Sequence, residues 1–318
     1  METDKVKIVP VLKMVLRILL GAFFIATAIM KLLSLDHFEL YIFSFQIFNF
    51  VLSAIIARLV IAAEMILGFF LIFKILYKPT WWATMLMMGG FTLLLVYVAI
   101  FRNDSSCHCM GDLVELNPAW SIVKNLVTIV LLLLIRRETP ARFRGWKLVG
   151  ILGVCAAFVA TFVCFPLDGI YNLFKKDKNP YNEEAFHAFM QDSLMRAQEL
   201  DTGNYIIGVV ASGCKYCKIS AEKLQAISER NRLDDSRILL TIWGKEESLA
   251  EFEEITGDSE FRYVTISPIQ AVQLVNGRFP TYLFVHNGQV VQTADLRQLT
   301  ERGVVDFIPQ QKQASSHE

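Results

Sequence analysis

The sequence predicts a membrane all-α helical bundle, formed by a four-helix unit and a fifth transmembrane helix, followed by a soluble α/β domain. Three observations carry this prediction. Hydrophobic residues make up 54% of the 318 residues, and the mean hydropathy of +0.42 exceeds what a soluble core needs. The apolar residues gather in long runs before Pro180, whereas the residues after it alternate in a mixed α/β pattern. Four of the six cysteines form two close pairs.

Five apolar runs are long enough to cross ~30 Å of hydrocarbon as helices. They cover residues 11–33, 51–75, 81–101, 118–135 and 146–166. Charged residues lie mostly near the ends of these runs, and we expect Lys13, Arg17 and Lys31 to extend toward the membrane surface. The aromatic-rich segment from Phe38 to Phe50 predicts an interfacial or re-entrant stretch on one membrane face.

The basic residues predict the orientation of the five helices. The N-terminal segment and the loops on its side carry nine of them, whereas the opposite loops carry only Arg102. The positive-inside rule therefore predicts a cytoplasmic N-terminus and a C-terminal domain on the periplasmic side. The nine are Lys5, Lys7, Lys74, Lys78, Arg136, Arg137, Arg142, Arg144 and Lys147. The two cysteine pairs then share one non-cytoplasmic compartment, where disulfides persist.

Net charge argues against one class of partner. The 31 basic and 31 acidic residues cancel to a formal charge of zero. A chain without a basic excess lacks the field that attracts nucleic acid, so we expect no nucleic-acid partner.

The residues after Pro180 predict helices that alternate with strands. We expect an amphipathic helix over 182–200, a strand over 205–211 and a helix from the cysteines to about residue 230. A second strand over 237–243 and a helix over 246–255 follow. The dipeptide Asn287-Gly288 predicts a hairpin turn between strands 281–285 and 289–293.

The pair Cys214 and Cys217 lies between the first of these strands and its helix. A thiol at a helix N-terminus faces unpaired N–H groups and the positive end of the helix dipole, and Lys215 and Lys218 add charge; all favour a reactive thiolate. The two-residue spacing lets the pair close a disulfide. A zinc knuckle would need a second ligand pair nearby, and haem attachment would need His where Lys218 stands. Redox activity is favoured over a structural disulfide.

The motif Cys214-Lys215-Tyr216-Cys217 at a helix start, with Phe279-Pro280-Thr281 entering a hairpin, resembles the thioredoxin fold and its cis-proline. The resemblance covers residues 182–309 and leaves 310–318 as a tail. It implies that Cys214 is the catalytic nucleophile and Cys217 the resolving thiol, with Pro280 and Thr281 binding an extended substrate. Many thioredoxins carry Trp just before the first cysteine and a buried acid six residues before it. Here Gly213 and Gly208 hold those positions.

The second pair, Cys107 and Cys109, lies in a loop between the third and fourth apolar runs as Cys107-His108-Cys109-Met110-Gly111. Three interpretations compete: an exchanging dithiol, a soft-metal site that adds His108 or Met110, and a static disulfide. One intervening residue makes a small, strained ring, which favours a labile pair.

Residues 7–137 are similar to the methylamine-utilisation MauE type of DoxX-like membrane protein. Three sequence features carry the resemblance: Leu16-Arg17-Ile18-Leu19-Leu20-Gly21, Glu64-Met65-Ile66-Leu67-Gly68 and Cys107-His108-Cys109-Met110-Gly111. The family usually has Phe at the position of Met110. The resemblance implies a role in disulfide formation or maturation of exported proteins.

Charged residues inside the apolar runs mark a further candidate site. Arg58 and Glu64 lie in the second run, where charge is costly and faces the bundle interior. They stand ~120° apart around a helix and ~9 Å along it, so we expect them not to pair with each other. Lys124 is a candidate partner for Glu64. A structural ion pair competes here with a quinone or proton site. Cys155 and Cys164 are interpreted as buried apolar thiols.

Together these features predict a membrane-anchored thiol–disulfide oxidoreductase. Cys214 and Cys217 would exchange with exported protein thiols, and Cys107 and Cys109 would relay electrons to or from the membrane. By analogy with the vitamin K epoxide reductase architecture, a quinone is the suggested acceptor, which makes the protein an oxidase. A reductase or isomerase would use the same thiols in the opposite direction. The alternative from another class is a non-catalytic maturation factor or soft-metal-handling protein that uses Cys107, His108 and Cys109.

Overall fold

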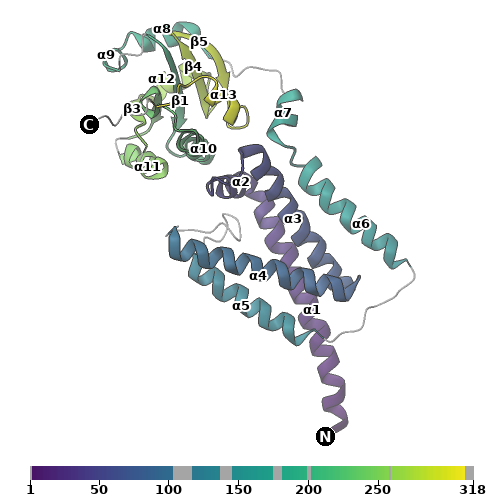
Figure 1. Ribbon diagram of the computed structural model, residues 1–318. Coiled ribbons are helices and arrows are strands. Elements are labelled where there is room, and N and C mark those ends of the chain that lie inside the picture. Colours follow the sequence, from purple (N-terminus) through teal and green to yellow (C-terminus); the bar gives the residue numbers. More distant parts are fainter. Residues whose placement is uncertain are drawn as a thin grey trace. The chain divides into compact units, whose positions relative to one another are not determined.

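The computed structural model describes residues 2–102, 117–136, 145–174, 181–198, 202–245, 247–257 and 259–311. The chain forms two compact units (Figure 1). The first contains residues 1–45 and 51–167, and the second contains residues 168–318 with the short segment 46–50.

In the part of the chain that the structure describes, the first unit contains helices and no strand. Four of its helices are long and apolar enough to cross a membrane, over Pro10–Leu33, Phe50–Phe73, Tyr77–Phe101 and Trp146–Val163. The helix of the predicted fourth span is shorter than these four stretches, with 17 residues that extend about 26 Å. The helices are α1 (Glu2–Leu33), α2 (Leu35–Phe43), α3 (Phe50–Phe73), α4 (Tyr77–Phe101), α5 (Pro118–Leu134) and α6 (Trp146–Phe158), which continues as the π-helical turn η1 (Val159–Val163).

Helices α1 and α3 pack backbone against backbone. A Cβ atom built on Gly21 would lie 2.6 Å from the carbonyl oxygen of Gly68, and one built on Gly68 would lie 2.7 Å from that of Gly21. No side chain fits between the two, so glycine at both positions allows the close approach that membrane helices use. The resemblance named both glycines, and the structure gives their reason.

Two basic residues of α1, Arg17 and Lys31, point into the bundle. Arg17 is buried and donates to the carbonyl oxygens of Leu71 and Ile72 at the end of α3. Lys31 is buried as well and forms an ion pair with Glu64. The prediction that these two side chains extend toward the membrane surface is therefore wrong, because each finds a partner on the neighbouring helix.

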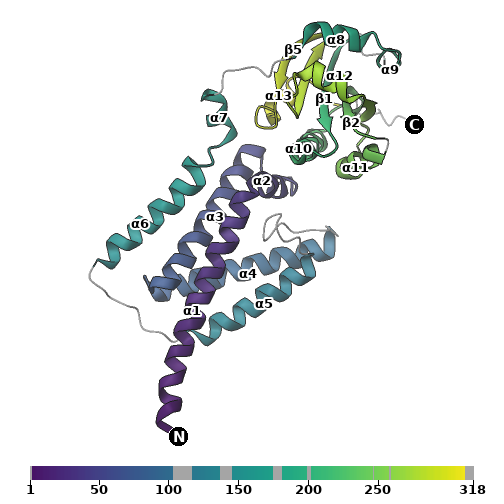
Figure 2. The ribbon, with the colours of Figure 1, turned by 180° about the vertical axis from the view of Figure 1, so that it is seen from behind.

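Helices α4 and α5 lie side by side in both ribbon views (Figures 1 and 2). The indole N–H of Trp81 donates to the carbonyl oxygen of Leu132 at 2.8 Å. The hydroxyl of Tyr77 donates to the carbonyl oxygen of Ile135 at 2.5 Å. The last carbonyl groups of a helix have no partner within it, so these two aromatic donors of α4 satisfy carbonyl groups at the end of α5.

The predicted interfacial segment begins as helix α2. Its side chains Phe38, Leu40 and Phe43 are buried, and Phe38 packs with Ala28 of α1 and Ile61 of α3. The helical part of this segment therefore belongs to the core of the bundle.

The two cysteines of the fifth apolar run differ from the prediction. Cys155 and Cys164 are both exposed rather than buried. Within α6 only Gly150 and Ala157 are buried, so most of this helix presents its side chains to its surroundings. In a membrane those surroundings are lipid, where a thiol behaves as a small apolar group.

The second unit is an α/β domain around a five-stranded mixed sheet with the order β3-β2-β1-β4-β5. Strand β1 is parallel to β2 and antiparallel to β4, β2 is parallel to β3, and β4 is antiparallel to β5. The strands are β1 (Asn204–Ala211), β2 (Ile238–Trp243), β3 (Arg262–Ile266), β4 (Thr281–His286) and β5 (Gln289–Ala294). All four predicted strands are confirmed, and β3 is an additional edge strand.

Helices cover both faces of this sheet. On one face Ile207 and Val209 of β1 pack with Phe186 of α8 and Leu274 of α12. On the other face lies α10, which contacts β1, α11 and α13. The helices are α7 (Asp168–Phe174), α8 (Glu183–Met190), α9 (Ser193–Arg196), α10 (Lys215–Asn231), the 3₁₀ turn η2 (Asp235–Arg237), α11 (Glu247–Thr256), α12 (Pro268–Val275) and α13 (Glu301–Val305).

The helix predicted over 182–200 is two helices. The chain leaves α8 after Met190, and the side chain of Asp192 accepts the N–H of Leu194 and so begins α9. An aspartate competes for backbone N–H groups and favours such a new start over an unbroken helix.

Candidate active site

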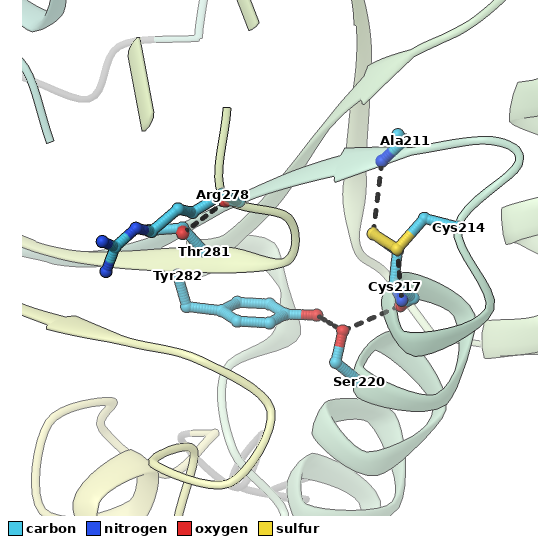
Figure 3. Close-up of a disulfide and its surroundings, with 7 residues drawn as sticks. All are labelled: Ala211, Cys214, Cys217, Ser220, Arg278, Thr281 and Tyr282. Carbon is cyan, nitrogen blue, oxygen red and sulfur yellow. Dashed lines mark hydrogen bonds between the residues drawn. A yellow bond between two sulfur atoms is a disulfide. The ribbon is translucent and has the colours of Figure 1, made fainter. Parts of the chain in front are cut away.

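The first cysteine of the Cys-x-x-Cys motif begins helix α10. Strand β1 ends at Ala211, and Cys214 is the N-cap of the helix, with its sulfur accepting the backbone N–H of Cys217 at 3.2 Å. Cys214 and Cys217 form a disulfide, with their Cα atoms 5.2 Å apart (Figure 3). The predicted sequence of strand, turn, cysteine pair and helix is confirmed.

The two sulfur-bearing residues differ in access. Cys214 is half-buried, whereas Cys217 is fully buried and its sulfur accepts the N–H of Ala211 at 3.5 Å. A Cβ atom at Gly213 would meet nothing within 4 Å, so the approach beside Cys214 is open where many thioredoxins carry Trp. An external sulfur therefore reaches Cys214 first.

The positive environment of Cys214 comes mainly from backbone. The N-cap position places its sulfur against the N–H of Cys217 and the positive end of the helix dipole, which both favour a thiolate. Lys218, which the sequence analysis counted as added charge, forms an ion pair with Glu251 of α11. Its contribution to the thiolate is therefore reduced.

The peptide bond between Phe279 and Pro280 is cis, as the resemblance implies. Val209 of β1 stands opposite Thr281 in the antiparallel ladder, so Pro280 lies at the end of β1 that leads to Cys214. The side chain of Thr281 is fully buried, and its hydroxyl donates to the carbonyl oxygen of Arg278 at 2.7 Å. This side chain fixes the turn before β4.

An aromatic pair that the sequence analysis did not single out lies at the same end of the sheet. The rings of Trp243, the last residue of β2, and Phe279 are 5.5 Å apart. The backbone N–H of Ser212 donates to the carbonyl oxygen of Trp243 at 3.0 Å, which joins this strand end to the turn before Cys214. Trp243 ends one predicted strand and Phe279 comes shortly before another, but the sequence does not show that these two strand ends meet.

A chain of hydroxyl groups leads from the sheet to Cys217. Tyr282 of β4 donates to Ser220 at 2.7 Å, and Ser220 donates to the carbonyl oxygen of Cys217 at 2.8 Å (Figure 3). Burial raises the pKa of Tyr282, and its hydrogen bond with Ser220 opposes this only in part. Tyr282 is therefore neutral at physiological pH.

Among the residues that the structure describes, Glu64 and Arg58 of α3 each belong to a buried ion pair. Lys31 contacts both carboxylate oxygens of Glu64, at 2.6 and 2.7 Å, and Arg58 pairs with Glu39 of α2. Arg58 also donates to the carbonyl oxygens of Phe165 and Pro166. The sequence suggested Lys124 as the partner of Glu64, but Lys31 holds that place. Lys31 lies at the end of a different predicted span, and nothing in the sequence indicates that it pairs with Glu64.

The residues Cys107, His108, Cys109 and Met110 lie outside the described residues, so their exchange or metal chemistry stays a prediction. Across the described ranges, no three histidine, cysteine, aspartate or glutamate side chains gather as a metal site.

Comparisons with known proteins agree with this architecture. Residues 9–138 match the family model described as methylamine utilisation protein MauE. Protein TlpB of Flavobacterium psychrophilum is 22% identical, and the alignment covers 86% of this chain and 88% of TlpB. No solved structure matches the chain significantly. The chain is thus a multi-pass membrane protein that joins a MauE-type membrane domain to a C-terminal α/β domain consistent with the thioredoxin fold.

Proposed function

We propose that this protein is a membrane-anchored thiol–disulfide oxidoreductase that acts on exported proteins. One observation carries the proposal: Cys214, a half-buried residue at the N-cap of α10, is bonded to the fully buried Cys217. This asymmetry suits an exchanging pair, because one sulfur meets the client and the other completes the reaction out of its reach. The cis-proline at the adjacent strand end and the similarity to TlpB over both units support the proposal.

The proposed reaction transfers a disulfide to the client. A client thiolate attacks Cys214, the Cys214–Cys217 bond breaks, and Cys217 leaves as a thiolate that takes up a proton. A second client thiolate then attacks the client sulfur of this mixed disulfide. The client disulfide forms, Cys214 leaves with the electron pair, and the domain retains two thiols in place of its disulfide.

Regeneration would use the loop pair. In this proposal, the Cys107–Cys109 disulfide reoxidises the reduced domain on the periplasmic side, and a membrane quinone is the acceptor class for the two electrons. Arg58 and Glu64, the residues suggested for a quinone or proton site, are each held in an internal ion pair. We therefore assign these ion pairs a structural role.

Trapping in cells tests the function. Replacement of Cys217 by serine removes the resolving sulfur, so we expect full-length Cys217→Ser to accumulate mixed disulfides between Cys214 and exported proteins. These species should vanish on reduction and be absent from Cys214→Ser/Cys217→Ser. Cys155→Ser, which changes an exposed thiol outside the motif, is the matched control. If Cys217→Ser carries no more mixed disulfides than this control, the proposed function is wrong.

The redox state of the motif tests the direction. In an oxidase, loss of the loop pair blocks reoxidation, so Cys107→Ser/Cys109→Ser should leave Cys214 and Cys217 reduced in cells. Alkylation of acid-quenched samples measures this state. Accumulation of the oxidised form would instead assign the opposite direction of electron flow.

A further inference from the structure

The hydroxyl chain next to Cys217 is closed to solvent. Tyr282, Ser220 and Cys217 are all fully buried. Each hydroxyl donates its one proton within the chain: Tyr282 to Ser220, and Ser220 to the carbonyl oxygen of Cys217. A buried polar group without a partner is costly, so this arrangement fixes Ser220, and with it the first turn of α10, against the sheet.

The ring of Tyr282 also fills the space beside Gly208. Gly208 stands opposite Tyr282 in the ladder between β1 and β4. A Cβ atom at Gly208 would lie 2.7 Å from Cε1 of Tyr282 and 2.7 Å from Cδ2 of Leu240. No acidic side chain fits at position 208 while the tyrosine ring is present. At the position where many thioredoxins carry a buried acid, this chain therefore has glycine beside the ring of a neutral tyrosine.

We propose that Tyr282 is a positioning residue for thiol exchange, which acts through Ser220 to hold the second cysteine in line for attack on Cys214. This inference rests on the proposed function. The Ser220 hydrogen bond reaches the carbonyl oxygen of Cys217 itself, so its loss frees the residue that carries the resolving sulfur. The neutral chain does this without placing a second negative charge beside the thiolate that Cys217 becomes.

The positioning acts on one reversible step: Cys217 leaves Cys214 when the domain oxidises a client, and in the reverse direction it attacks Cys214 and resolves the mixed disulfide. The reverse direction is the one followed here. The Cys217 thiol gives up its proton, and its sulfur attacks the sulfur of Cys214. The bond between Cys214 and the client breaks, and the client sulfur leaves with the electron pair and takes up the proton. Atoms and charge balance within the pair and the client.

The experiment compares wild type, Tyr282→Phe, Ser220→Ala and the double variant as full-length proteins in detergent. Glutathione disulfide is the probe, and the rate of Cys217 attack on the Cys214–glutathione bond and the equilibrium constant with glutathione are measured. Loss of one neutral hydrogen bond predicts a slowing and a shift of about two- to tenfold in each single variant. The double variant should be no worse than either single one, because the two hydroxyls act as one chain.

Tyr263→Phe is the matched control. It removes a hydrogen bond between Tyr263 and Thr256 in the same domain, away from the cysteines. Tyr263→Phe should alter thermal unfolding but neither exchange quantity. Wild-type values in Tyr282→Phe, or equal shifts in Tyr263→Phe, overturn the inference while the function stands. Absence of any exchange by Cys214 in wild type would instead refute the proposed function.

Discussion

At the scale of single residues, the candidate site depends on how Tyr282 packs against the strand beside it. Gly208 and Tyr282 lie opposite each other on neighbouring strands, and the ring occupies the volume that a side chain at 208 would need. Glycine is unusual in the middle of a central strand because it packs nothing and loses more conformational freedom on folding than other residues. Here glycine at position 208 leaves the volume that the buried ring of Tyr282 occupies.

Gly208→Ala tests this packing. The new methyl group would lie 2.7 Å from side-chain atoms of both Tyr282 and Leu240, so these side chains or their strands must shift. Such overpacking predicts a loss of about 1–3 kcal/mol in the free energy of unfolding. Thermal unfolding of the purified protein measures this loss. Gly213→Ala, where a Cβ meets nothing within 4 Å, is the control. Equal melting temperatures for the two variants would contradict the packing argument.

The sequence predicted the placement of the candidate cysteines and the proline better than the contacts that surround them. Cys214, Cys217 and Pro280 belong to local patterns, so their placement follows from spacing and neighbouring strands. Tyr282 and Ser220 are 62 residues apart and meet only when β4 lies beside β1. Gly208 shows that the buried acid of many thioredoxins is missing here. It does not show which side chain fills the space beside it.

At the scale of elements, the contact between α1 and α3 combines three kinds of interaction. The two glycines bring the backbones together, Arg17 satisfies carbonyl groups at one end, and Lys31 pairs with Glu64 at another point. Lys31 also lies 6.0 Å from the ring centre of Phe38 and 5.9 Å from that of Phe91. Apolar and aromatic surroundings of this kind strengthen the attraction between paired charges and make an unpaired charge costly.

The pair of Lys31 and Glu64 predicts a non-additive mutant cycle. Glu64→Gln leaves a buried lysine without its counter-charge, which costs about 3–5 kcal/mol of stability in known buried pairs. Lys31→Met/Glu64→Gln removes both charges and should be more stable than Glu64→Gln alone. Thermal unfolding in detergent gives the order. If Glu64→Gln unfolds like wild type while regeneration of the motif stops, the pair is a proton site and not a structural one.

The predictions of helices and strands were right where the hydrophobic periodicity was strong. They were wrong where the outcome depended on side-chain contacts such as caps and ion pairs. The long apolar runs and the strands around the cysteines were recognised from composition and alternation. Strand β3 was missed because Arg262–Ile266 is short and lies at the sheet edge. Helices α8 and α9 were merged because the capping by Asp192 depends on its backbone conformation. Ion-pair partners in the bundle depend on helix packing, which the sequence does not encode locally.

At the scale of the whole molecule, the two units differ in surface and in architecture. The first is apolar on its outer surface and has helices of spanning length, whereas the second buries its core around a mixed sheet and carries the disulfide. The proposed relay requires that the two cysteine pairs lie on one side of the membrane.

Thiol labelling tests that requirement. In full-length variants that retain one cysteine each, a membrane-impermeant maleimide applied from the periplasmic side should modify both Cys109 and Cys214. A cysteine introduced by Lys78→Cys in a cysteine-free chain should react only after the membrane is opened. Protection of Cys109 under conditions that modify Cys214 would exclude the relay between the pairs.

The outward position of Cys155 and Cys164 has a practical consequence for such work. Cys155 lies in α6 and Cys164 directly follows the π-helical turn η1, so in a membrane the two exposed thiols present native sulfurs to lipid at different depths. Hydrocarbon disfavours the thiolate that maleimides require, so both should stay silent toward aqueous reagents. Carrying a spin label each, they would serve as a built-in ruler for immersion depth against a paramagnetic quencher dissolved in the bilayer.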